Sequence, residues 1–189
     1  MKQEEKSCFD SFLEVVKAVN STLDRHEVLD LLVSNTTQVM NLKASAIRLL
    51  DEKQRTLELV ASHGLSEKYL NKGPVDADKS IADAMEGKTV SIYNAPEDPR
   101  VQYPKEVAKE GVASILSVPL RTKGRVIGVM RLLTAEPREF SEEEIDSAEA
   151  LAEMGAIAIE NAKMYERIKQ DYETVMKDVY SFVGYRRSL

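Results

Sequence analysis

The sequence predicts an α+β domain in which an antiparallel sheet of about five strands packs with helices from both ends of the chain. Three patterns support this fold class. Apolar and polar residues alternate over 44–61, and 113–134 consists of two apolar runs joined by a basic turn, and both patterns are typical of strands. Apolar residues recur at gaps of three and four over 9–40, as on a helix face. The same helical spacing continues from 151 to 182, which predicts one long C-terminal helix.

Two helices are expected first. The first, over residues 1–23, presents one apolar stripe, and Asp24 followed by Glu27 is a capping-box pattern that predicts the start of the second. The first stripe consists of Phe9, Phe12, Val16, Val19 and Leu23, and the second of Val28, Leu31, Leu32, Val39 and Met40.

Two hairpins are expected next, separated by irregular chain. The first spans 44–61 with its turn at 51–54. A short helix closed by Gly87 follows, and then a strand at 90–92. Three prolines make 94–104 a loop. The second hairpin pairs 113–120 with 125–134 around the turn sequence RTKG.

The long helix begins at Ser141, a favoured N-cap residue. Its seam contains Leu151, Met154, Ala158, Asn161, Tyr165, Ile168, Tyr172, Val175, Val179 and Phe182. From Tyr165 onward the seam outruns a compact domain, so its natural partner is a second copy in a parallel homodimer. Asn161 either fixes the register of that dimer or hydrogen-bonds within its own subunit.

Composition limits the classes of function. A chain of 189 residues suits one domain with an appendage, and a net charge of −6 disfavours nucleic acid and anionic membranes as partners. The single cysteine, Cys8, allows no internal disulfide and no cysteine-rich zinc cluster. No leader or bilayer-spanning stretch is recognised, so a cytoplasmic location is expected.

Catalytic motifs are not found. The two histidines, His26 and His63, are far apart in sequence, and no metalloprotease, nucleophile-elbow, phosphate-loop or CxxC motif occurs. His63 ends a strand and either hydrogen-bonds loop backbone or faces a pocket. The sequence therefore predicts neither an enzyme nor a metal site or cofactor.

Several stretches together resemble the GAF family of small-molecule-sensing and dimerising domains. They are STLDRHEVLDLL, AIRLLDEKQRTLELVASHGLS, EGVASILSVPLRTKGRVIGVMRLL and PREFSEEEIDSAEALAEMGAIAIENAKMYE. The resemblance implies a PAS-related antiparallel sheet, here of five to six strands. The terminal helices would cover one face and form the dimer interface, and the other face would hold any ligand. Residues 24–160 would be the core, and 161–189 a coiled-coil signalling extension.

The known subtypes of this family fit poorly. The Asn-Lys pair of cyclic-nucleotide binders is replaced by Leu133 and Thr134. Covalent bilin needs a pocket cysteine, and free methionine sulfoxide reductases need several cysteines. Haem would require a pocket histidine, for which only His63 is available.

Arg48 and Arg131 are the strongest ligand candidates, because each interrupts an apolar alternation in strands that the resemblance makes neighbours. Two guanidinium groups would favour an anionic ligand. Alternatively, each pairs with a local glutamate or reaches water, or Ile81, Met85 and Tyr103 fill the pocket. The remaining candidates for ligand contact are His63, Met85, Arg100, Tyr103 and Ser114.

The expected function is a GAF-type regulatory domain that binds a small ligand and passes its state through a dimeric helix bundle. The receiver would be an output protein in trans, such as a kinase or other effector. The alternative is a ligand-free dimerisation scaffold. The expected interface residues are Phe9, Phe12, Val16, Val19, Leu151, Met154, Asn161, Tyr165, Ile168, Tyr172, Val175 and Val179.

Overall fold

A six-stranded antiparallel sheet forms the centre of the domain in a computed structural model of the chain. The strand order is β3-β2-β1-β6-β5-β4. The structure describes residues 13, 15, 17, 21–51, 56–73, 75–76 and 81–186, with side chains described as far as residue 177. The strands are β1 (Ala44–Asp51), β2 (Thr56–His63), β3 (Val75–Asp76), β4 (Val90–Ile92), β5 (Ser114–Thr122) and β6 (Arg125–Thr134). The predicted fold class and both predicted hairpins are confirmed.

The two longest strands, β5 and β6, are joined by a tight turn. Lys123 and Gly124 both have positive φ, at 50° and 75°, and Thr122 pairs with Arg125 on either side of them. Positive φ at both central residues is the geometry of a type I′ turn, which matches the twist of the paired strands. This turn fixes the pairing at the end of the hairpin, and a β-bulge between Leu120 and Arg121 shifts the register of the two strands beyond it.

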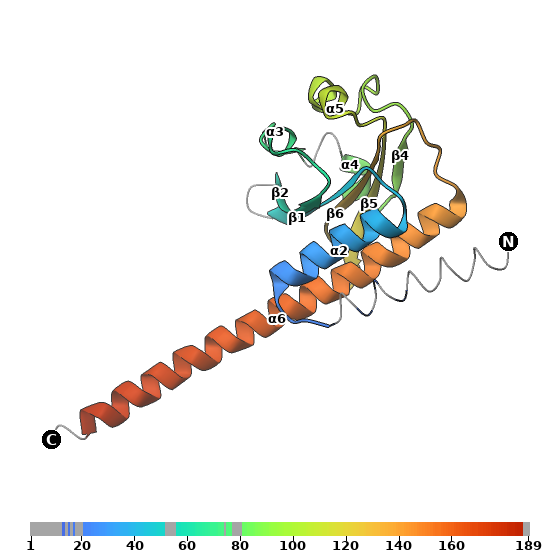
Figure 1. The fold of residues 1–189 in the computed structure, drawn as a ribbon. Coiled ribbons are helices and arrows are strands. Elements are labelled where there is room, and N and C mark those ends of the chain that lie inside the picture. The colour runs from blue at the N-terminus through green and yellow to red at the C-terminus, as the bar shows by residue number, and fades with distance from the viewer. Residues whose placement is uncertain are drawn as a thin grey trace.

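Two helices, α2 (Arg25–Val39) and α6 (Glu142–Arg186), lie side by side on one face of the sheet (Figure 1). Asp24 caps α2 as predicted, accepting hydrogen bonds from two backbone N–H groups. Ser141 and Glu144 form a reciprocal capping box at the start of α6. The two helices approach closely at Gly155, where a Cβ atom would lie 2.2 Å from Leu32 Cδ2. Their apolar faces and the sheet enclose the largest core cluster.

Three short helices lie on the other face of the sheet (Figure 1). They are α3 (Glu67–Leu70), α4 (Ala82–Met85) and α5 (Pro104–Glu110). The apolar residues on this face form two separate clusters, one around Ile115 and Leu133 and the other around Leu57 and Val129. The face away from the long helices is therefore not one continuous apolar core.

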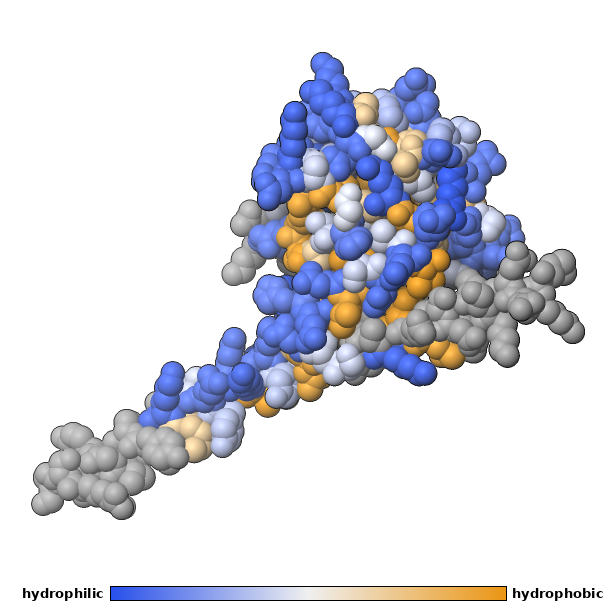
Figure 2. Space-filling view, viewed as in Figure 1, coloured by the Kyte–Doolittle hydropathy of each residue, from blue (hydrophilic) through white to orange (hydrophobic). Residues whose placement is uncertain are grey.

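Beyond the sheet, α6 continues as an exposed helix. Figure 2 shows apolar side chains along the lower edge of this extension and polar side chains along its upper edge. The exposed apolar residues of α6 are Ile157, Met164, Tyr165, Ile168, Tyr172 and Val175. None of the described helices is both long enough and apolar enough to cross a membrane.

One predicted interface residue requires correction. Leu151 is only 1% exposed and packs in the core beneath the sheet, so it is not available to a second subunit. The seam turns gradually around a straight helix, because 3.6 residues per turn do not match a seven-residue repeat. Met154 is half-buried and Asn161 is exposed. Phe9, Phe12, Val16 and Val19, and the side chain of Val179, lie outside the described residues.

Candidate functional site

Arg48 and Arg131 lie on the same face of the sheet, as the sequence predicts. Arg131 on β6 is opposite Ala46 on β1, and Arg48 is opposite Val129. Residues two apart on a strand share a face, so the two arginines are diagonal neighbours. Both are buried, with exposed fractions of 5% for Arg48 and 6% for Arg131. They lie on the face that carries the three short helices.

The hydrogen bonding of these two arginines is incomplete. Nη1 of Arg48 donates to the carbonyl oxygen of Leu57 at 3.2 Å. Nε and Nη2 of Arg131 are buried and have no hydrogen-bond acceptor in the described part of the chain. Buried donors without partners are rare in folded proteins, and a buried cation is costly to leave unpaired.

Arg100 shows what the edge of a guanidinium group formed by Nε and Nη2 can bind. Its Nε and Nη2 donate to the two carboxylate oxygens of Asp98, at 2.9 Å and 2.6 Å. The same edge of Arg131 is buried and unpaired within the described ranges. A carboxylate or phosphoryl group, with two adjacent oxygens, is the chemistry that matches this edge.

The electrostatic environment of the site is cationic. Burial lowers the pKa of Arg48 to about 10, and the charge of Arg131 contributes to the same shift. Burial also lowers the pKa of Arg131. Tyr69 is close to both arginines, and burial raises the pKa of its phenol. An anionic group here would relieve the repulsion between the two guanidinium groups.

A third cation, Lys72, lies at the end of α3. Its Nζ sits 3.5 Å above the centre of the Tyr69 ring and donates to the Tyr69 carbonyl oxygen at 3.2 Å. Burial, followed by the charges of Arg48 and Arg131, lowers the pKa of Lys72 to about 7. Sequence reasoning missed Tyr69 and Lys72, for which the one available signal is that Lys72 follows Tyr69 by three residues, just beyond the end of α3.

Lys72 also lines a cavity of about 490 Å³ between α3 and α5. Ser66 and Glu110 join the two helices across it, because the backbone N–H and hydroxyl of Ser66 donate to the Glu110 carboxylate at 2.8 Å and 2.5 Å. Tyr69 belongs both to the lining of this cavity and to the surroundings of the buried arginines. The lining residues are Ser66, Lys68, Tyr69, Lys72, Glu106, Lys109 and Glu110.

Met85 and Tyr103, two further predicted candidates, lie on the same face. Both pack against the apolar cluster that contains Ile81 and Val129. The charge of Arg48 also interacts with Tyr103. These residues thus lie beside the arginines. Their packing against the cluster that contains Ile81 is what we would expect if Ile81, Met85 and Tyr103 filled the pocket in place of a ligand.

Three predicted candidates lie elsewhere, which corrects their expected positions. Arg100 is exposed and is paired with Asp98, two residues away in sequence. The Ser114 hydroxyl donates to the carbonyl oxygen of Tyr93 at 2.6 Å and accepts from the backbone N–H of Arg138 at 2.8 Å, so it ties loops together. His63 ends β2 and faces α2, on the side of the sheet opposite the arginines.

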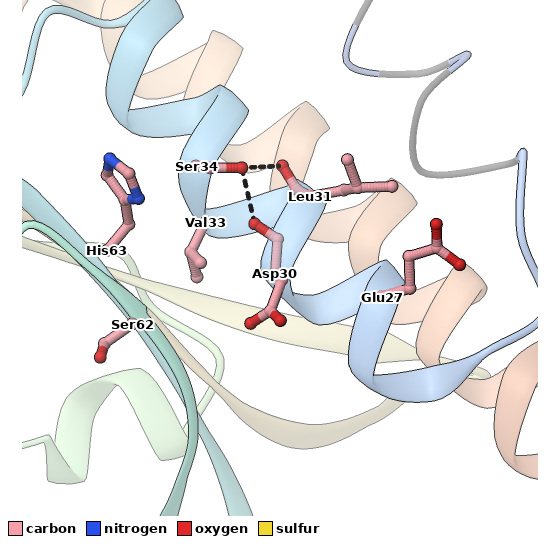
Figure 3. A pocket seen from close by; sticks show the side chains of 7 residues that line it. All are labelled: Glu27, Asp30, Leu31, Val33, Ser34, Ser62 and His63. Atoms are coloured by element: carbon pink, nitrogen blue, oxygen red, sulfur yellow. Dashed lines mark hydrogen bonds between the residues drawn. The ribbon is translucent and has the colours of Figure 1, made fainter.

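His63 lines a second cavity of about 530 Å³ between α2 and β2. In Figure 3, the carboxylate of Glu27 points away from His63, and the hydroxyl of Ser34 bonds to backbone carbonyl oxygens of its own helix. Nowhere in the described ranges do three His, Cys, Asp or Glu side chains gather as a metal site would need. This cavity therefore offers fewer convergent groups than the arginine site.

Comparisons with known proteins agree with the fold. A family model described as "GAF domain" matches residues 22–160. The chain is similar to the methyl sulfide methyltransferase-associated sensor of Methanosarcina acetivorans, with 28% identity over 163 residues, which cover 82% of this chain and 16% of that protein. It is also similar to the formate hydrogenlyase transcriptional activator of Salmonella typhimurium, with 23% identity over 181 residues, covering 92% of this chain and 26% of that protein.

A solved structure gives the same result for the fold. The GAF domain from a phosphoenolpyruvate-protein phosphotransferase of Coxiella burnetii superposes with a TM-score of 0.77 at 20% identity, covering 86% of this chain and 98% of that one. The chain spans about a quarter or less of the length of the two curated relatives, at 26% and 16%.

Proposed function

The chain belongs to the GAF domain family, whose members are typically sensory or regulatory in signalling, and we propose that it senses a small anionic ligand. The ligand binds between the sheet and the three short helices, with a carboxylate or phosphoryl group on the free edge of Arg131. Its binding state is passed through α6 to an output protein in trans. The observation that carries this proposal is the pair of buried donors on Arg131 that have no acceptor among the described residues.

Strand β6 supports the coupling between site and helix. Arg131 faces the site, while its chain neighbours Met130 and Leu132 face the opposite side and pack in the core that contains α6. Met130 and Leu132 thus belong to the same apolar core as residues of α6, and a ligand that moves Arg131 would act on the helix through this shared core. The ligand shifts the arrangement of α6 only if it binds two such arrangements with different affinity.

A retained ligand can be detected directly. We expect native mass spectrometry of protein purified from its own host to show a dimer with an added small mass. The added mass should be lost in Arg48→Ala and in Arg131→Ala, because each removes a cation from the site. Arg100→Ala is the matched control, since Arg100 binds Asp98 outside the site. A clean dimer without added mass would favour the scaffold alternative, which the packing of Ile81, Met85 and Tyr103 supports.

The exposed seam of α6 supports a homodimer as part of the proposal. Ile168, Tyr172 and Val175 are each about 60% exposed, at 60%, 64% and 59%. Apolar residues at this spacing on an isolated helix are stabilised by a second helix in a coiled coil.

Charged substitutions in this seam should separate the subunits. We expect Ile168→Asp and Val175→Asp to yield monomers, because each would bury a carboxylate between apolar surfaces. Gel filtration with light scattering gives the mass. Gln170→Asp is the control, since it adds the same charge on the opposite side of the helix. If both seam variants remain dimeric, the interface lies elsewhere.

Three further parts of the proposal follow from sequence. The chain acts by binding rather than by catalysis, works in the cytoplasm, and carries its signalling extension from residue 161 onward. The single cysteine supports the cytoplasmic location. The net charge of −6 disfavours nucleic acid and anionic membranes as partners. The exposed seam on the far part of α6 supports the extension.

A further inference from the structure

The site contains more positive charge than a single carboxylate would neutralise. Arg48 and Arg131 are buried together, and Lys72 lies close enough to both for their charges to act on it. Two carboxylates of α5 lie near Lys72, those of Glu106 and Glu110. Glu110 is already hydrogen-bonded to Ser66, and neither carboxylate pairs with Arg131.

Lys72 has a position that differs from those of the arginines. Arg48 and Arg131 are buried on the sheet, whereas Lys72 is half-buried and lines the cavity between α3 and α5. Tyr69 lines this cavity and also lies close to both arginines, so the cavity and the arginine pair share this residue as a wall. A molecule bound beside Tyr69 would have one end at Arg131 and the other beside the amine of Lys72.

Resting on the proposed function, we propose that the ligand is a small dianion held by Arg48, Arg131 and Lys72, and that Lys72 gains a proton when the ligand binds. A carboxylate or phosphoryl group binds the edge of Arg131, and the second negative charge faces Lys72. Lys72 thus determines specificity for divalent over monovalent anions.

The direction of the proton transfer follows from the charges that face Lys72. Burial and the charges of Arg48 and Arg131 oppose the ammonium form of Lys72, while Glu110 and Glu106 favour it. The contact between Nζ and the face of the Tyr69 ring also favours the ammonium form. With a pKa of about 7, the free amine is roughly half protonated at neutral pH. An anion bound beside it favours the ammonium form, so ligand binding takes up a proton and weakens as pH rises.

Inorganic sulfate is a suitable probe, because it stays divalent over the relevant pH range. We expect calorimetric titration to show sulfate affinity falling about tenfold between about pH 6 and about pH 8, with uptake of about half a proton per site near pH 7. Nitrate, which is monovalent, should bind more weakly than sulfate at the lower pH.

Substitutions of Lys72 make the test specific. Lys72→Arg should keep sulfate binding and lose its pH dependence, because arginine stays charged throughout this range. Lys72→Met should weaken sulfate binding about tenfold at the lower pH and reduce the preference over nitrate. The matched controls are Lys68→Met and Lys109→Met, which alter other cations that line the same cavity.

Each outcome decides between the hypotheses. Sulfate binding that is lost in Arg131→Met but independent of pH in the wild type would overturn the dianion proposal and leave the proposed function standing. A pH dependence that persists in Lys72→Arg, or equal affinity for sulfate and nitrate, would also overturn it. Absence of sulfate binding to the wild type would overturn the anion site itself.

Discussion

Arg131→Met should abolish sulfate binding and at the same time make the unliganded protein more stable. Arg131 is 6% exposed, and two of its donors have no partner among the described residues. Replacing an unpaired buried charge with an apolar side chain of similar length removes a desolvation cost, which we expect to be about 1–3 kcal/mol. It also removes repulsion from Arg48, whose pKa should rise toward its ordinary value.

Urea unfolding of the two proteins, with and without sulfate, measures both effects. The wild type should gain more stability with sulfate than the variant, because binding to the folded state adds to the general stabilisation that sulfate gives any folded protein. Arg100→Met is the control. It removes an exposed ion pair, so we expect a loss of at most about 1 kcal/mol and unchanged sulfate binding. A variant less stable than the wild type would mean that Arg131 has a structural role.

Gly128→Ala should strongly destabilise the fold. An added Cβ at Gly128 would lie 2.3 Å from the carbonyl oxygen of Arg48 and 3.0 Å from Cα of Leu49. Both contacts are with the backbone of the adjacent strand, which cannot move without breaking the pairing of β1 and β6. We expect a loss of about 3 kcal/mol or more.

The control for this effect is another glycine. Gly111 has a φ of 70° and open space around the added methyl group, so Gly111→Ala isolates conformational strain at about 1 kcal/mol. Chemical denaturation of both variants gives the comparison. Similar losses for the two would show that the close approach of the strands at Gly128 does not limit stability.

The sheet was predictable from sequence because its long strands show two patterns typical of strands. Apolar and polar residues alternate in β1 and β2, whereas β5 and β6 are apolar over most of their length. The alternation around Arg48 and Arg131 placed both residues on strands, and the pairing of β1 with β6 then placed them on one face. Helix starts were also predictable, since Asp24 and Ser141 both cap their helices and Glu144 completes the capping box of Ser141. At Asp24 the box is not closed by Glu27, because the backbone N–H of Asp24 donates to the Thr22 hydroxyl and the Glu27 carboxylate accepts from that hydroxyl.

The short helices were harder to predict. The three prolines in 94–104 indicated a loop, yet Pro104 occupies the first turn of α5, where its missing N–H costs nothing, and Gly111 ends that helix with a positive φ. β3 has only two residues, too few to show any period. Lys72 stood in a polar stretch like any surface lysine, and its surroundings arise only when α3 folds over the sheet.

The continuity of α6 has a mechanical consequence. The helix is buried in the domain as far as Ala162 and then runs to Arg186 without interruption, a distance of roughly 36 Å at 1.5 Å per residue. The helix is therefore one continuous rod, with its first part packed in the core and its second part extending beyond the domain. A tilt of about 5° at the sheet would carry the far end sideways by about 3 Å. A shift of side chains too small to disturb the packing of the domain would thus become a displacement large enough for another protein to detect.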